Sequence, residues 1–100
     1  MRTIRVFCNM GMSTSVLVRN MKQSAEKQGY EVDITAFSVA EVKEKGAEAD
    51  IILLGPQVGF QLKKIREQLP QKEVHVIKSA DYGMMNGDAV IRFVRETLGD

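Results

Sequence analysis

The chain has 100 residues, of which 27% are charged and 44% hydrophobic, and its formal net charge is +1 at pH 7. Basic and acidic residues are interspersed, which argues against a nucleic-acid-binding surface. No segment approaches the ~20 apolar residues of a membrane-spanning helix, the N-terminus has no signal-peptide pattern, and a single cysteine excludes an internal disulfide, so we expect one cytoplasmic domain over residues 1–100.

The first part of the chain predicts a strand, a helix and a second strand. An apolar run over 3–8 is typical of a strand. Apolar residues then recur at spacings of three and four over 13–28, which predicts a helix, and Gly29 is a natural end for it. Over 30–36 apolar and polar residues alternate, as in a strand with one exposed face.

The rest of the chain continues the alternation of helices and strands. A capping-box pattern predicts a short helix over 38–46. Residues 51–54 are continuously apolar, which indicates a central strand covered on both faces. A helix is predicted over 56–69, a fourth strand over 74–77 and a last helix over 86–98.

This alternation predicts an α/β fold, an open four-stranded parallel sheet with helices on both faces. The most polar strand belongs at an edge and the most apolar one near the centre, which the strand order 2-1-3-4 satisfies. Ligands of such sheets bind beyond the carboxyl ends of the strands, where the order reverses. Segments 8–15, 55–57 and 79–83 all follow strands at that edge.

The only cysteine, Cys8, ends the first strand just before a turn that contains Gly11 and opens a helix. The N-terminus of a helix offers unpaired backbone amides, which hold phosphate and favour thiolate over thiol. We therefore expect Cys8 to be a nucleophile and the turn to bind a phosphoryl group through backbone amides and hydroxyls. The predicted phosphate-binding residues are Asn9, Met10, Gly11, Met12, Ser13, Thr14 and Ser15.

Several of these residues also admit a purely structural interpretation. Cys8 could be a small buried hydrophobic residue, and Gly11 could serve the turn alone. Ser13 or Thr14 could cap the helix as well as bind phosphate. His75 lies within the predicted fourth strand and is expected to decorate an edge strand, so we assign it no role.

The predicted fold and the position of Cys8 resemble the low-molecular-weight tyrosine phosphatases, which makes a cysteine phosphatase the alternative function. That family carries an arginine six positions after the cysteine, where this chain has Thr14. Threonine cannot form the bidentate hydrogen bonds to phosphate that an arginine guanidinium forms. Asp81 and Tyr82 faintly resemble the general-acid loop of the same family. A third hypothesis is a redox sensor, although no second cysteine is present to resolve an oxidised Cys8.

Three motifs together resemble another family more closely. They are Cys-Asn-Met-Gly-Met-Ser-Thr-Ser over 8–15, Gly-Pro-Gln-Val over 55–58 and Asp-Tyr-Gly-Met-Met-Asn-Gly over 81–87. In this order and spacing they are similar to the IIB component of the lactose/cellobiose branch of the sugar phosphotransferase system, over essentially the whole chain. The chain departs from that pattern at Asn9 and Met10, because small residues commonly follow the cysteine.

The resemblance implies a phosphoryl relay. A phosphohistidine on a IIA partner would donate to Cys8, and a sugar presented by a membrane IIC permease would accept the group during uptake. The sugars of this branch include cellobiose, chitobiose, lactose and related β-glucosides. Gln57 and Tyr82 would line the site, no metal or other cofactor is expected, and the domain would dock transiently at the inner face of the permease.

Overall fold

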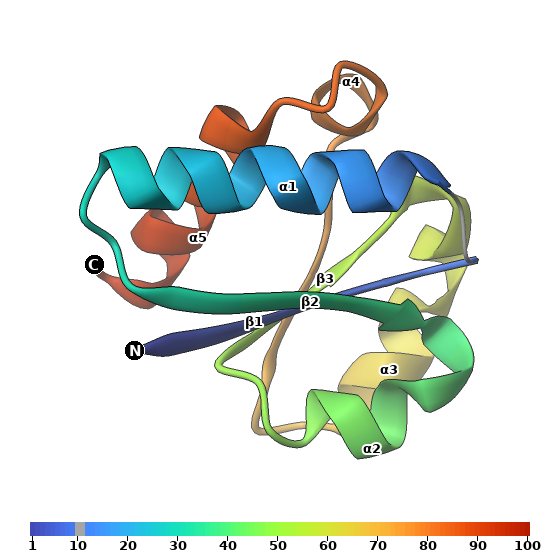
Figure 1. The fold of residues 1–100 in the computed structure, drawn as a ribbon. Coiled ribbons are helices and arrows are strands. Elements are labelled where there is room, and N and C mark those ends of the chain that lie inside the picture. The colour runs from blue at the N-terminus through green and yellow to red at the C-terminus, as the bar shows by residue number, and fades with distance from the viewer. Residues whose placement is uncertain (10–11) are drawn as a thin grey trace.

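The computed structural model describes residues 1–9 and 12–100, in which one parallel sheet lies between two layers of helices (Figure 1). The strands are β1 (Arg2–Cys8), β2 (Val32–Ser38), β3 (Ile51–Leu54) and β4 (Glu73–Val76). Their order is β2-β1-β3-β4, and every neighbouring pair is parallel. The predicted strand order, with the half-polar strand at an edge and the apolar one inside, is therefore confirmed.

The helices divide between the two faces of the sheet. Along the chain they are α1 (Met12–Lys27), the 3-10 helix η1 (Val39–Glu41), α2 (Val42–Gly46), the 3-10 helix η2 (Pro56–Gln61), α3 (Leu62–Gln68), α4 (Ser79–Gly83) and α5 (Gly87–Leu98). Figure 1 shows α1, α4 and α5 on one side of the sheet and α2 and α3 on the other. This is the doubly covered architecture that the alternation of elements predicts.

Several predicted segments differ from the structure. The strand predicted over 30–36 extends to Ser38, and the helix predicted over 38–46 starts as the 3-10 helix η1 before α2 begins at Val42. The helix predicted over 56–69 starts as a 3-10 helix and becomes α-helical only from Leu62, because Pro56 and Gly59 are poor helix formers. Residues 79–83, for which no helix is predicted, form the one-turn helix α4. A helix of that length leaves no apolar periodicity that a sequence pattern could reveal.

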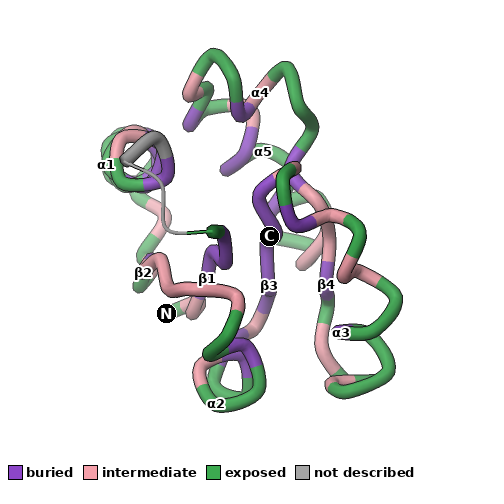
Figure 2. The backbone as a smooth tube through the Cα atoms, turned by 90° about the vertical axis from the view of Figure 1, so that its right-hand side faces the viewer, coloured by how far each residue is buried: buried purple, intermediate pink, exposed green. Residues whose placement is uncertain are grey.

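A hydrophobic core lies on each face of the sheet. On the α1 side, Ile4, Val6 and Leu53 pack with residues of α1 and α5. On the α2 side, Phe7 and Leu54 pack with residues of α2 and α3. All four residues of β3 are buried, as expected for a central strand covered on both faces, and Figure 2 shows this strand in the buried colour along most of its length.

The alternation of side chains along β1 also places the cysteine. Ile4 and Val6 face α1, whereas Phe7 faces α2. Because successive side chains of a strand point to opposite faces, Cys8 points to the same face as Ile4 and Val6. The thiol therefore lies on the side of the sheet that α1 covers.

Candidate active site

Cys8 is the last residue of β1, at the carboxyl edge of the sheet, and it is 5% exposed. Its neighbour in β2 is Ser38, and on the other side the backbone N–H of Gly55 donates to the carbonyl of Phe7 at 2.9 Å. This bond holds the segment that follows β3 against the end of β1. Cys8 thus lies where the two central strands end, which is the edge predicted from the strand order.

Gly55 marks the point where the predicted segments meet. A Cβ atom at this glycine would lie 3.5 Å from Cys8 Cβ, 3.6 Å from Tyr82 Cε2 and 3.2 Å from Gln57 Oε1. The structure therefore brings Cys8, Gln57 and Tyr82 together, although they follow three different strands. Gly55 was not among the predicted site residues; its position directly after the most apolar strand is the signal that could have identified it.

Thr14 and Tyr82 join the first turn of α1 to α4. Their hydroxyl oxygens lie 2.8 Å apart, and the two residues are 2% and 8% exposed. The prediction that Ser13 or Thr14 caps the helix is wrong, because α1 begins at Met12 and both residues lie inside its first turn. The Thr14 hydroxyl instead makes the hydrogen bond with Tyr82.

The other predicted phosphate-binding residues lie around the start of α1. Asn9 is exposed directly after Cys8, and Ser15 is exposed in the first turn of the helix. The predictions for Met10 and Gly11 fall outside the described residues, as do those for the side chains of Met12 and Ser13. The described part of this segment consequently offers Asn9 and the first turn of α1 at the edge where Cys8 lies.

Asp81 and His75 both lie close to α5, at the part of the sheet where β4 forms the edge. Asp81 lines a groove of about 310 Å³ together with Lys78, Arg92 and Phe93. His75 Nε2 lies 2.9 Å from Glu73 Oε1. The imidazole ring also packs edge-on against the ring of Phe93, with 5.2 Å between the ring centroids. β4 is an edge strand, as expected for His75.

Over residues 1–9 and 12–100, no three or more His, Cys, Asp or Glu side chains are grouped so that they could hold a metal ion. Within the same ranges, no helix combines the length and the apolar character needed to cross a bilayer.

Comparison with known proteins identifies relatives along nearly the whole chain. Residues 3–93 match the family model described as PTS system, Lactose/Cellobiose specific IIB subunit. The galactose-specific and cellobiose-specific EIIB components of two Lactococcus lactis strains are each 37% identical over 97 residues, covering 90% of this chain and 90% of theirs. The oligo-beta-mannoside-specific EIIB component of Bacillus subtilis is 38% identical over 89 residues, covering 87% of this chain and 86% of its own.

Solved structures share the fold. The lactose-specific IIB component domain from Streptococcus pneumoniae superposes with a TM-score of 0.85 at 15% identity and covers 95% of both chains. The cellobiose-specific IIB component from Borrelia burgdorferi superposes with a TM-score of 0.70 at 29% identity, over 90% of this chain and 86% of its own. The chain belongs to the lactose/cellobiose-specific IIB family and is a phosphotransferase component of a sugar phosphotransferase system.

Proposed function

We propose that Cys8 is the residue that carries the phosphoryl group in this IIB component. It would receive the group from a phosphohistidine on a IIA partner and pass it to a sugar that a membrane IIC permease presents. The observation that carries this proposal is the position of Cys8, which ends β1 on the face covered by α1, with Gln57 and Tyr82 beside the same point at Gly55.

The chemistry consists of two phosphoryl transfers. In the first, the Cys8 thiolate attacks phosphorus, a sulfur–phosphorus bond forms, the nitrogen–phosphorus bond of phosphohistidine breaks, and the imidazole leaves with the electron pair. In the second, a sugar hydroxyl oxygen attacks phosphorus, loses its proton to solvent, and releases Cys8 as the thiolate. Both transition states place charge on the equatorial phosphoryl oxygens, which fixed donors stabilise.

The first turn of α1 is suited to supply those donors. The backbone N–H groups at the start of a helix have no intrahelical partners, and the helix dipole favours an anion there. A phosphorylated cysteine carries about −2 charge at neutral pH, whereas one helix terminus contributes only ~0.3–2 kcal/mol. Several amides among residues 9–15 must therefore act together, with Gln57 and Tyr82 lining the site.

The relatives support a sugar class. Their names refer to galactose, cellobiose and oligo-beta-mannosides. We assign this chain a sugar of the cellobiose, chitobiose or lactose class, with the permease making the final selection. A IIB component that passes a phosphoryl group to a sugar held by a permease works from the cytoplasm, so the domain would dock transiently at the inner face of the membrane.

The decisive experiment is phosphorylation by a phosphorylated IIA protein from the lactose/cellobiose branch. Intact-mass measurement should show one added phosphoryl group on the wild type, and iodine, which cleaves sulfur–phosphorus bonds, should remove it. Cys8→Ser should remain unmodified, whereas Thr97→Ala, which alters a hydroxyl in α5 away from the proposed site, should still be phosphorylated.

Two outcomes would contradict the proposal. Phosphate on Cys8→Ser would place the carrier elsewhere in the chain. Steady release of inorganic phosphate from an aryl phosphate by the wild type would instead favour the cysteine phosphatase. Because Thr14 occupies the place of the phosphatase arginine and is bonded to Tyr82, we expect no such turnover.

A further inference from the structure

We infer that Thr14 and Tyr82 are a positioning pair for Cys8, which sets the first turn of α1 over the thiol through one buried hydrogen bond. The inference rests on the proposed function, since it concerns the phosphoryl transfer at Cys8. It assigns the Thr14 hydroxyl to Tyr82 rather than to direct contact with the phosphoryl group.

The hydroxyls of Thr14 and Tyr82 form a hydrogen bond with each other in the interior of the protein. They lie 2.8 Å apart in a region where Thr14 is 2% exposed, so solvent does not compete for the bond. In the described part of the chain, no buried side-chain nitrogen or oxygen lacks a hydrogen-bond partner. Breaking this pair would therefore leave a buried hydroxyl without its partner, which costs more than losing an exposed hydrogen bond.

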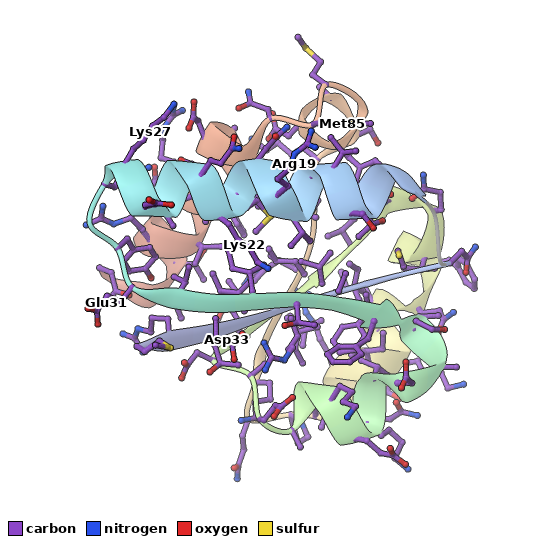
Figure 3. The ribbon with its side chains drawn as sticks, in the orientation of Figure 1. Arg19, Lys22, Lys27, Glu31, Asp33 and Met85 are labelled. Atoms are coloured by element: carbon purple, nitrogen blue, oxygen red, sulfur yellow. The ribbon has the colours of Figure 1, made fainter. Side chains whose placement is uncertain are left out.

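Tyr82 is held on a segment that is itself attached to α1. Its backbone N–H donates to the carbonyl of Lys78 at 2.9 Å within the turn of α4. Further along the chain, the side-chain amide of Asn20 donates to the carbonyl of Met85 at 2.8 Å, and Figure 3 shows Met85 beside α1. The segment carrying Tyr82 thus meets α1 at two places, which limits how far the tyrosine can move relative to the helix.

The tyrosine ring extends from this attachment toward Cys8. Tyr82 Cε2 lies 3.6 Å from the point where a Gly55 Cβ would be, and Cys8 Cβ lies 3.5 Å from the same point. The ring therefore extends from the end of β3, beside Cys8, to Thr14 in the first turn of α1. A shift of this turn relative to Cys8 would misalign the amides proposed to stabilise the phosphoryl group.

A double-mutant cycle tests the pair directly. Thr14→Val and Tyr82→Phe each remove one hydroxyl and keep most of the side chain. We expect each to slow Cys8 phosphorylation at saturating IIA by about threefold to tenfold, the effect of one lost hydrogen bond, with the KM for the IIA protein unchanged. The double variant should be no slower than either single variant, because both remove the same bond.

Two controls separate positioning from general loss of structure. Thr14→Ser keeps the hydroxyl and should restore the wild-type rate. Tyr30→Phe makes the same chemical change in the other tyrosine, whose hydroxyl bonds to Asp100 at 2.6 Å at the amino edge of the sheet, and it should leave the rate unchanged. All variants are compared at a temperature where circular dichroism shows them folded.

A second measurement does not depend on the IIA protein. Alkylation of Cys8 by iodoacetamide, a small neutral reagent, should become severalfold faster in Thr14→Val and in Tyr82→Phe, because the tyrosine ring near Cys8 is held less firmly. The double variant should again match the single ones. If the wild type took no phosphate from IIA, the proposed function would fail, while alkylation would still report whether the two hydroxyls act as a unit.

The inference is overturned by any of three results. Single-variant effects that multiply in the double variant would show that Thr14 acts independently, as a phosphate ligand would. A wild-type phosphorylation rate in Tyr82→Phe would show that its hydroxyl is not needed. A Thr14→Ser variant as slow as Thr14→Val would show that the methyl group matters rather than the hydrogen bond.

Discussion

The carboxyl and amino edges of the sheet each hold a tyrosine hydroxyl, in opposite chemical settings. At the carboxyl edge, Tyr82 meets the neutral hydroxyl of Thr14 in the interior. At the amino edge, Tyr30 donates to the carboxylate of Asp100 near solvent, and Arg2 donates to both oxygens of the same carboxylate at 2.8 and 2.9 Å. One edge is joined by a neutral pair and the other by paired charges.

The shifted pKa values at the amino edge follow from these partners. The hydrogen bond from Arg2, followed by that from Tyr30, lowers the pKa of Asp100 to about 2. Burial, followed by the hydrogen bond to Asp100, raises the pKa of Tyr30 to about 12. The charges of Arg2 and Asp100 compensate each other there. At the carboxyl edge, by contrast, Thr14 and Tyr82 are neutral and the first turn of α1 contains no acidic residue. An incoming phosphoryl group is therefore favoured at the carboxyl edge.

The largest predicted effect concerns α1, which runs along the sheet from the carboxyl ends of the strands to their amino ends (Figure 1). A shift of this helix would disturb the contacts at both edges. Gly87 opens α5 against the middle of α1, and a Cβ there would lie 2.4 Å from the carbonyl carbon of Asn20. The backbone of α1 cannot give way as a side chain could. Gly87→Ala should therefore lower the free energy of unfolding by about 3 kcal/mol, measured by urea denaturation.

Gly83→Ala is the matched control for this prediction. A Cβ at Gly83 would meet nothing within 4 Å, so the free energy of unfolding of this variant should stay close to that of the wild type. Equal stability of the two alanine variants would show that the contact between α1 and α5 does not determine the spacing of these helices.

The next effect is confined to the carboxyl edge. A methyl group at Gly55 would touch Cys8 and Tyr82 at ordinary distances and Gln57 Oε1 at a tight 3.2 Å, which the flexible end of that side chain can relieve. Gly55→Ala should leave the free energy of unfolding within about 1 kcal/mol of the wild type. Cys8 phosphorylation should slow by about tenfold, because the methyl group occupies space next to both Cys8 and Tyr82.

Gly59→Ala provides the comparison for that rate. Its Cβ would lie 3.3 Å from Val76 Cγ1, a similarly tight contact against a different residue. Phosphorylation should proceed at the wild-type rate in this variant. If both alanine variants slowed the reaction equally, crowding anywhere in the segment after β3, rather than beside Cys8, would be responsible.

The sequence predicted the order of the strands and the place of the site better than it predicted the contacts between individual side chains. The order of strands followed from hydropathy, because Ile51–Leu54 is apolar throughout and the strand at 30–36 alternates. The meeting of Cys8, Gln57 and Tyr82 followed from topology, since parallel strands gather their carboxyl ends at one edge. Both are properties of short stretches of sequence combined with general packing rules.

Contacts between distant residues were beyond the reach of those rules. The bond between Thr14 and Tyr82 joins positions 68 residues apart, and without it Thr14 was interpreted as a cap or a phosphate ligand. Arg5, counted within an apolar run, is 6% exposed because Asp33 and Glu48 pair with it from β2 and from the segment after α2. Such partners become visible only when the chain is folded.

A smaller effect is predicted at the amino edge, where Tyr30→Phe removes the bond to Asp100. Because this bond lies near solvent, we expect a loss of about 1 kcal/mol at pH 7, measured by urea denaturation. The Tyr30 pKa is raised from 10.0 to about 12. The contribution of the protonated hydroxyl to the free energy of unfolding is therefore complete below pH 10 and disappears as the pH rises toward 12. The difference between wild type and variant should shrink over that range. A constant difference would show that the hydroxyl proton is not what stabilises the fold.

The smallest effect is expected for Asp100→Asn, which keeps an oxygen that can accept from Arg2 or Tyr30 and removes only the negative charge. The pKa of Asp100 is lowered from 3.8 to about 2, so the stabilisation by its charge is complete above about pH 4 and is lost as the pH falls toward 2. The urea midpoints of wild type and variant should therefore differ slightly at pH 6 and converge on acidification. Added salt should reduce the difference at pH 6 as well, since exposed charge pairs are screened. Midpoints that stay apart at pH 2 would show that the carboxylate acts through its shape rather than its charge, and the two edges would then differ only in burial.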